Sequence, residues 1–461
     1  MLDQNQAAEI FNRIKRHSTA DEVEVLCYGG KSALTRFANN IIHQNVAEEN
    51  YSVSVRTVFG GRTARATTNK LDDESLLRVV QASESLAKVQ HPDPDLLPMP
   101  DAGEGSRAAR AVPGRYFTET AALTPELRAD GVQKIVSVAD RHKLTTAGIF
   151  SSAEWVEGIF NSRGLSNWHT HTSSEISITM LADDSSGWQK SNYPDVSQQD
   201  PAGLAEIAAR KALESAGPRE VPPGKYTVIL EPAAVLDMVG FMFFDFGGLS
   251  ILDQRSFLNN RVGTQVFGPN INVWDDALDP LQAGSPFDGE GIPRQRVQLV
   301  ENGVVKRLVY ARATAKKMKQ SEYADKLGPV AATGHGFSLP NEMGEAPINI
   351  VFGTPADPRT VDQMIASTEH GVLVTRLWYI REVDPYEKIL TGMTRDGTFY
   401  IENGKVRHGI LNFRFNESLI HMLSNVEAMG TPVRASGEES FDMVAPSMKV
   451  KDFNFTEVTK F

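Results

Sequence analysis

The sequence predicts an α+β protein, with an N-terminal domain of antiparallel strands and helices and a C-terminal domain rich in β-structure. The chain has 461 residues, more than the roughly 250 to 300 at which one hydrophobic core stops growing, so at least two domains are expected. Its 36 glycines and 24 prolines are spread along the chain and indicate many turns. With 41% hydrophobic and 23% charged residues, the composition is that of an ordinary globular protein.

The first 90 residues alternate between helix and strand signals. Apolar residues at helical spacing predict a helix over residues 4–17. A second helix is expected over residues 72–89, because acidic residues begin it. Between these helices lie four strand-like segments, at residues 23–28, 32–37, 51–59 and 62–67.

A loop at residues 91–107, rich in Pro, Asp and Gly, is expected to cross the surface. It separates two similar halves of the N-terminal domain, at about residues 1–90 and 108–218. The second half is predicted to contain a helix over residues 125–142 and strands over residues 146–150, 155–161 and 174–181.

The two halves show a weak internal echo. Phe37 lies 16 residues before Val53, and Phe160 lies 16 residues before Ile176. The order of helices and strands is not expected to repeat strictly. Either the halves are a duplication or two hairpins share a common pattern.

A well-marked helix over residues 201–216 ends the N-terminal domain, with Asp200 as its N-cap and Pro201 in its first position. Residues 219–224 follow as a linker. We therefore place the N-terminal domain at residues 1–218 and the C-terminal domain at residues 225–461.

In the C-terminal domain, a buried strand over residues 226–230 precedes an apolar helix over residues 233–246. Two Asn-Gly turns, at Asn302-Gly303 and Asn403-Gly404, predict β-hairpins. A last helix is predicted over residues 416–429.

Charge and cysteine content exclude several classes of protein. A formal charge of -11 opposes direct binding of a nucleic-acid backbone. No apolar run is long enough for a membrane span, and we expect a cytoplasmic protein without membrane partners. The one cysteine, Cys27, cannot form an intramolecular disulfide or a thiolate cluster, and its apolar surroundings predict a buried, inert thiol.

None of the ten histidines lies three to five residues from another, so no helix carries a zinc-binding histidine pair. His169 and His171 would share one face of a strand and could hold a metal, although solvated or cross-strand roles are commoner. His335, between Gly334 and Gly336, is expected to be exposed, either as a ligand contact or as part of a flexible turn.

A cation site or a pair of catalytic carboxylates could be formed by an acidic run, Asp275-Asp276 followed by Asp279, Asp288 and Glu290, but turn-capping is the commoner role for such residues. The chain also lacks a nucleophile elbow and a glycine-rich phosphate loop. Simple motifs therefore identify no enzyme.

The order and spacing of many short motifs, strongest from about residue 225 onward, resemble the TldD/PmbA family of metallopeptidase-related proteins. The resemblance implies a cytoplasmic α+β protein that dimerises. The motifs are Val228-Ile229-Leu230-Glu231-Pro232, Arg261-Val262-Gly263, Asn272-Val273-Trp274-Asp275-Asp276, 287–293 (FDGEGIP), Glu301-Asn302-Gly303, Thr333-Gly334, 395–399 (RDGTF), 401–404 (IENG) and 413–417 (FRFNE).

In the catalytic branch of this family, an HExxxH helix follows the first of these motifs, and a C-terminal cysteine completes the metal site. The corresponding helix falls at about residues 239–245, where this chain reads VGFMFFD. It therefore lacks both histidines and the glutamate, and Cys27 lies in the other domain. Among the positions of this degenerate motif are Val239, Gly240, Phe241, Phe244 and Asp245.

The resemblance thus indicates the PmbA (TldE) branch, a non-catalytic subunit that positions an unfolded or leader peptide for a zinc-bearing partner. It implies no metal or other cofactor in this chain, and a homodimer or a heterodimer with an HExxxH-bearing relative. The expected substrate-cavity residues are Gly334, His335, Gly336, Asp288 and Glu290. The alternatives are an active metallopeptidase that uses His169 and His171, and a regulatory or binding homodimer.

Overall fold

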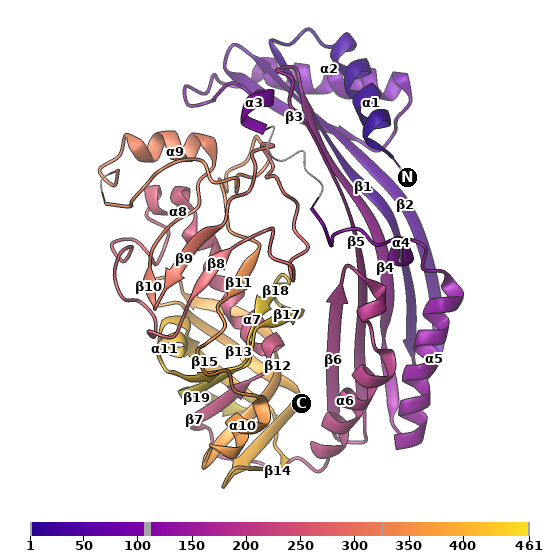
Figure 1. Ribbon diagram of the computed structural model, residues 1–461, viewed down its shortest axis with the longest axis vertical. Helices are drawn as coiled ribbons and strands as arrows, with labels where there is room; N and C mark the ends of the chain where they lie inside the picture. Colours follow the sequence, from indigo (N-terminus) through magenta and orange to yellow (C-terminus); the bar gives the residue numbers. More distant parts are fainter. Residues whose placement is uncertain (1, 106–111, 325, 460–461) are drawn as a thin grey trace.

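The computed structural model describes residues 2–105, 112–324 and 326–459. The protein is α+β: a long, curved antiparallel sheet carries helices on its outer face, and a β-rich C-terminal domain lies along its inner face (Figure 1). The end of the predicted loop at 106–107 and the start of the second half at 108–111 lie outside the described residues.

The N-terminal sheet has six strands in the order β3-β2-β1-β4-β5-β6. Its elements in chain order are α1 (Gln4–His17), β1 (Glu22–Ala38), β2 (Ile41–Phe59), β3 (Arg62–Thr68), α2 (Asp73–Val89), α3 (Ala102–Gly105), α4 (Thr118–Ala121), α5 (Pro125–His142), β4 (Thr145–Asn161), β5 (Ser166–Leu181), β6 (Ser186–Tyr193), η1 (Val196–Gln198) and α6 (Pro201–Glu214).

The two halves of this domain repeat one order, which corrects the sequence-based expectation. Each half has a long helix, three antiparallel strands and a second long helix, and β1 pairs with β4 at the centre of the sheet. Phe37 and Phe160 occupy the sixteenth position of two strands that are each 17 residues long. Whether the repeat reflects a duplication stays a prediction.

The long strands also differ from the prediction. β1 joins the two expected segments at 23–28 and 32–37, β4 joins those at 146–150 and 155–161, and β2 begins at Ile41. Gly29 and Gly30, which fall between the two expected segments, lie inside β1. A Cβ at Gly30 would collide with the carbonyl group of Glu154 on β4, so the glycine serves close backbone approach within the sheet.

Alternate residues of the strands pack beneath the helices of the outer face. One core, which includes Val25 and Val55, lies under α1 and α2, and another, which includes Ile176 and Ile178, lies under α5 and α6. Cys27 belongs to the first core, and burial raises its pKa to about 12, which fits the inert thiol expected from the sequence.

The C-terminal domain contains a six-stranded and a seven-stranded sheet around one large core. Its elements are β7 (Gly224–Leu230), α7 (Pro232–Val239), η2 (Gly240–Phe246), α8 (Gly248–Leu252), β8 (Val273–Asp275), β9 (Val297–Glu301), β10 (Val304–Val305), α9 (Arg312–Lys319), β11 (Ile350–Phe352), α10 (Val361–Ala366), β12 (His370–Asp384), β13 (Ile389–Glu402), β14 (Lys405–Gly409), β15 (Phe413–Ser418), α11 (Leu419–Ser424), β16 (Val426–Met429), β17 (Val433–Ala435), β18 (Met443–Ala445) and β19 (Met448–Val458).

Two predictions for this domain need correction. The helix expected over residues 416–429 is wrong: only α11 is helical, between β15 and β16, because both strands pair with β19. The helix expected over residues 233–246 is divided into α7 and the 3₁₀ turns of η2. Both Asn-Gly hairpins are confirmed.

Within the described residues, no helix is both long enough and apolar enough to cross a membrane.

Candidate functional site

The inner face of the N-terminal sheet holds a groove of about 520 Å³. Strand alternation directs one set of side chains to this face and the other to the helices. The lining comes from five strands and consists of Ser32, Ala33, Leu34, Arg36, Gln44, Val46, Glu48, Ile149, Ser151, Ser152, Ala153, Trp155, Ser173, Glu175 and Asn192. The groove thus offers an extended ligand hydroxyl and amide groups, aliphatic side chains and one indole ring.

Aromatic rings extend this groove toward the middle of β1 and β4. The rings of Tyr28 and Trp155 stack with centroids 5.6 Å apart and an interplanar angle of 13°. Tyr28 is nevertheless 53% exposed. Glu157 lies opposite Tyr28 in the strand register. Burial of the Tyr28 hydroxyl and, to a smaller extent, the charge of Glu157 raise its pKa. A ring that is stacked and still accessible can contact apolar parts of a ligand.

His169 and His171 lie next on this face, as alternation predicted, with their rings stacked 5.4 Å apart. His169 Nε2 and His171 Nδ1 are buried without hydrogen-bond partners. Burial, the neighbouring imidazole and Arg115 lower the pKa of His169 to about 3, and burial and Arg115 also lower the pKa of His171. The guanidinium of Arg115 makes a cation between these rings unfavourable.

His335 is buried, which corrects the expectation of an exposed side chain. Its Nε2 lies 2.9 Å from Asp275 Oδ1, and its Nδ1 lies 3.0 Å from Thr333 Oγ1. The other carboxylate oxygen of Asp275 accepts hydrogen bonds from the backbone N–H groups of Ile348 and Asn349. Burial alone would raise the pKa of Asp275, but His335, the charge of Arg294 and the N–H of Asn349 hold it below its ordinary value.

The other expected cavity residues gather around this pair. Asp288 Oδ1 accepts from the N–H groups of Glu290 and Ile292, so it caps its turn, and its Oδ2 accepts from Gly336 N at 2.8 Å. Gly334 has a φ of +72°, and a Cβ there would collide with the carbonyl of Pro293. The glycines therefore allow close packing of two loops.

Glu290, another member of this group, borders a cavity. It lines a pocket of about 140 Å³ together with apolar side chains that include Leu249 and Phe337. Its Oε1 accepts from the N–H of Arg312 at 3.1 Å. Burial, followed by the charge of Asp288, raises the pKa of Glu290 to about 7.

The helix at the family's metal-motif position is filled with apolar side chains. Val239 is completely buried in the C-terminal core, as are the phenylalanines at 243 and 246. Gly240 packs against Ser440, with which a Cβ would collide. Phe241 is partly buried against the same core, and Phe244 is 46% exposed and stacks on Phe337.

Asp245, the last motif position, is held by structural contacts. Its Oδ2 lies 2.6 Å from Lys388 Nζ, and its Oδ1 accepts from Phe257 N. Burial raises the pKa of Asp245, and Lys388 partly offsets this rise. Its charge is therefore neutralised by a neighbouring ammonium group.

These residues do not fit a zinc ion. Carbon side chains have no lone pair to donate, and the one carboxylate of the motif is already paired with a lysine. Across the residues that the structure describes, no three His, Cys, Asp or Glu side chains are grouped as a metal site would require.

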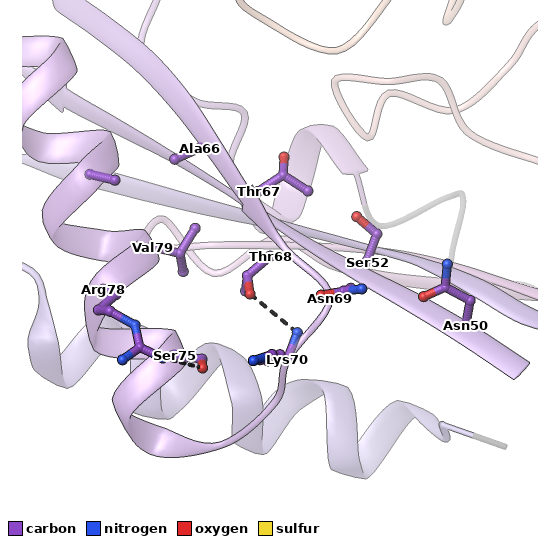
Figure 2. Close-up of a pocket in the computed structure, with 11 residues that line it drawn as sticks. Asn50, Ser52, Ala66, Thr67, Thr68, Asn69, Lys70, Ser75, Arg78 and Val79 are labelled. Carbon is purple, nitrogen blue, oxygen red and sulfur yellow. Dashed lines mark hydrogen bonds between the residues drawn. The ribbon is translucent and has the colours of Figure 1, made fainter.

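A second hollow lies at the β3 edge of the N-terminal sheet, where β3 ends. It measures about 610 Å³ and is lined by amide, hydroxyl and cationic side chains (Figure 2). The Arg78 guanidinium donates a hydrogen bond to the Ser75 hydroxyl on α2, and Lys70 lies in the segment that follows β3. Lining residues include Asn50, Ser52, Thr67, Thr68, Asn69 and Lys70.

Sequence reasoning missed two residues of these sites, Tyr28 and Trp155, and the partner of a third, Asp275. Tyr28 and Trp155 lie one strand apart on the inner face, and alternation along the full length of β1 and β4 would have indicated their face but not their pairing. Asp275 was predicted only as part of an acidic run and of a family motif. Its contact with His335 depends on loops that are distant in sequence.

Three family models match the chain in order. They describe PmbA/TldA metallopeptidase domain 1 at residues 23–87, the central domain at 119–216 and the C-terminal domain at 223–457. The last alone spans more than half of the chain. The chain belongs to the PmbA/TldD family.

Curated relatives of this PmbA/TldD family member include the metalloprotease PmbA of Escherichia coli O157:H7, with 21% identity over 94% of this chain and 92% of that protein. The metalloprotease PmbA homolog of Haemophilus influenzae is 21% identical over 87% of this chain and 85% of that protein.

Solved structures show the same fold. TldE from Thermococcus kodakarensis has a TM-score of 0.83 and 18% identity, covering 98% of this chain and all (100%) of that one. A candidate modulator of a DNA gyrase from Thermotoga maritima has a TM-score of 0.82 and 19% identity, with coverage of 98% and 100%.

Proposed function

We propose that this PmbA/TldD family member is a non-catalytic subunit of a metallopeptidase system, which holds an unfolded or leader peptide for hydrolysis by an HExxxH-bearing relative. The observation that carries the proposal is the helix at residues 239–245. Its side chains pack in the C-terminal core, stack on Phe337 or pair with Lys388, and they offer no set of zinc ligands.

The inner-face groove supports the peptide-holding role. Its walls combine aliphatic, hydroxyl and amide groups with the ring of Trp155, on which the ring of Tyr28 stacks. Such a surface can contact an extended chain through hydrogen bonds and ring faces without reading one particular sequence. Peptides of many sequences would therefore bind with modest affinity.

The test compares the purified chain alone with the chain mixed with the HExxxH relative from the same host. Expected results for the chain alone are zinc far below one ion per chain, binding of a fluorescent unstructured peptide by anisotropy, and no cleavage by mass spectrometry. Cleavage should appear with the relative and exceed that by the relative alone. Stoichiometric zinc with cleavage by this chain alone would refute the proposal.

The active-peptidase alternative makes a different prediction in the same experiment. If His169 and His171 hold a catalytic metal, replacing both with Ala should remove zinc and cleavage together. If neither activity nor zinc changes, these residues have no such role. Peptide binding without any effect of the relative would instead favour the regulatory or binding homodimer.

A matched pair of tyrosine variants tests the groove. Tyr28 and Tyr386 are both 53% exposed, but Tyr386 lies in the turn between β12 and β13. Loss of one aromatic contact costs about 1 kcal/mol, so Tyr28→Ala should weaken peptide binding about fivefold. Tyr386→Ala should leave it unchanged. Equal binding by both variants would contradict the assignment of the groove.

A further inference from the structure

Three buried polar atoms without hydrogen-bond partners in the described chain belong to neighbouring side chains at the inner face of the N-terminal sheet. They are Arg115 Nε, His169 Nε2 and His171 Nδ1. Arg115 and His169 are only 1% and 4% exposed. Most buried polar groups in folded proteins have a partner, so three such atoms in one cluster indicate a place where a polar ligand binds.

Arg115 belongs to a segment that runs along β5 and is fixed at both ends of its side chain. The N–H of Thr172, on β5, donates to the Arg115 carbonyl at 2.9 Å. The side chain crosses to the C-terminal domain, where Nη2 donates to the carbonyls of Ala277 and Asp279 at 2.8 and 2.9 Å. These contacts hold the guanidinium in place and leave its Nε without a partner within the described chain.

The charge of Arg115 has no anion of its own. Within the described residues, its hydrogen bonds go to backbone carbonyls and not to a carboxylate. Asp279 and Asp276 raise its pKa from a distance, but both carboxylates cap turns through backbone N–H groups. Burial and the charge of Arg434, which is paired with Asp442, lower the pKa of Arg115. A bound anion would therefore compensate a buried cation.

The two imidazoles add hydrogen-bond donors beside this guanidinium. Burial and the charge of Arg115 lower the pKa of both rings, so both are neutral at pH 7. A neutral imidazole carries one N–H, which can lie on either nitrogen. Each ring can therefore donate one hydrogen bond from its unpartnered nitrogen to the same acceptor group that Arg115 attracts.

Glu157 determines the side of the imidazoles on which an anion binds. It lies opposite His169 in the strand register, on the same face of the sheet. Its charge raises the pKa of His171, whereas the charges that act on Arg115 are those of Arg434, Asp279 and Asp276. An anion therefore belongs on the Arg115 side of the rings, away from the Glu157 carboxylate.

His171 connects this cluster with the inner-face groove. It lies opposite Trp155 in the strand register and two residues from Ser173, and both of these residues line the groove. Alternate residues of a strand share a face, so His169, His171 and Ser173 follow one another along β5. Because His171 is only half-buried, its ring meets the accessible surface at this end of the groove.

We propose that Arg115, His169 and His171 form a subsite for a carboxylate group of the peptide that lies in the groove. A carboxylate supplies the negative charge that Arg115 lacks, and its two oxygens accept hydrogen bonds from the guanidinium and from both rings. Both the C-terminus of a peptide and an acidic side chain offer this group. The subsite deepens the proposed function and rests on it for the identity of the ligand.

Fluorescence anisotropy with three peptides tests the subsite. All three share one sequence and an uncharged fluorophore: one ends in a free carboxylate, one in an amide, and the third ends in an amide but has Glu in place of a central Gln. A carboxylate should lower the dissociation constant about tenfold or more relative to the neutral peptide. Tighter binding of the first peptide assigns the chain end, and tighter binding of the third assigns a side chain. Equal binding of all three would overturn the inference.

Two substitutions of Arg115 separate its charge from its packing. Arg115→Lys keeps the charge and should retain part of the preference for a carboxylate, whereas Arg115→Met should lose it. Because Arg115 also holds the loop at residues 277–279, circular dichroism must show that each variant is folded. A folded Arg115→Met variant with the full preference of the parent would contradict the subsite.

Replacing both imidazoles with phenyl rings distinguishes binding from packing. The double variant His169→Phe, His171→Phe keeps two stacked rings but removes the unpartnered nitrogens, so it should unfold at a higher urea concentration than the parent. Its preference for a carboxylate should nevertheless fall about threefold. His91→Phe, at an exposed position, is the control and should leave the preference unchanged. A more stable double variant with the preference of the parent would refute the role of the imidazoles.

A small carboxylate separates the subsite from the proposed function. At equal ionic strength, N-acetylglycine should raise the melting temperature of the parent more than N-acetylglycinamide does, and Arg115→Met should abolish the difference. This result in a chain that binds no unstructured peptide would support the subsite and refute the proposed function. Peptide binding and cleavage with the HExxxH relative, without discrimination between carboxylate and amide, would overturn the subsite and leave the proposed function intact.

Discussion

Replacing His335 with Leu tests whether this buried histidine is a structural partner of Asp275. Leu is apolar and of similar bulk, so the change leaves Asp275 Oδ1 without its contact, while Oδ2 keeps the N–H groups of Ile348 and Asn349. Both side chains of the pair are completely buried (0% exposed). Removing one partner of such a pair costs about 3–5 kcal/mol.

Because two backbone donors remain, we expect the lower end, about 3 kcal/mol. The assay is urea unfolding at neutral pH, followed by circular dichroism. His91→Leu, at an exposed position, is the control and should change the stability by no more than about 0.5 kcal/mol. The double variant Asp275→Asn, His335→Leu should lose less than the sum of the two single variants, because no unpaired charge is left.

The pH dependence gives a further check on Asp275. Its folded-state pKa is lowered from 3.8. A carboxyl group with a lowered pKa contributes stability that is present above 3.8 and is lost as the pH falls through the folded-state value. A cost below about 1 kcal/mol for His335→Leu at neutral pH would refute the structural role and favour a functional one.

Three other variants test contacts around the same domain. The pKa of Glu290 is raised from 4.5 to about 7, so its burial lowers the stability progressively as the pH rises from 4.5 through 7. Glu290→Gln should therefore stabilise the protein by about 1–3 kcal/mol at pH 8 but little at pH 4.5. Gly240→Ala should destabilise it by about 1–3 kcal/mol in urea unfolding, and Ser440→Gly should relieve that loss. Lys388→Met leaves the Asp245 carboxylate unpaired and should cost about 3 kcal/mol, whereas adding Asp245→Asn should recover part of it. Unchanged unfolding curves for any of the three would contradict the corresponding contact.

The helix at residues 239–245 is part of the packing of the C-terminal domain. Val239 and the phenylalanines at 243 and 246 are buried in the C-terminal core, which also contains strands of both sheets. Histidines at these positions would place polar rings in an apolar core without partners, at a cost of about 1–3 kcal/mol for each unsatisfied group. Introducing zinc ligands there would therefore lower the stability of this domain.

Much of the secondary structure could be predicted because its signals are local. The bounds of α1 and α5 agree with the predicted helices, and α1 begins with a capping box between Asp3 and Gln6. The prediction over residues 416–429 failed for the opposite reason. Its apolar residues suit a helix, but pairing of β15 and β16 with β19 determines the backbone there.

The candidate site was only partly predictable. Alternation correctly placed His169 and His171 on one face. Gly336 and Asp288, which were grouped as expected cavity residues, are joined by a hydrogen bond from the Gly336 N–H. The burial of His335 could not be predicted from its flanking glycines. Those glycines serve loop packing, which a sequence pattern does not distinguish from exposure to a ligand.

By itself, the sequence determined the α+β class, the bounds of α1, α2, α5 and α6 to within two residues, and the residues at the metal-motif helix, because caps, periodicity and side-chain chemistry act within a few positions. Only the tertiary structure decided that β1 and β4 run unbroken, that His335 meets Asp275 and that Arg115 lies beside His169 and His171. These features depend on contacts between segments distant in sequence, where backbone approach and burial outweigh local preference.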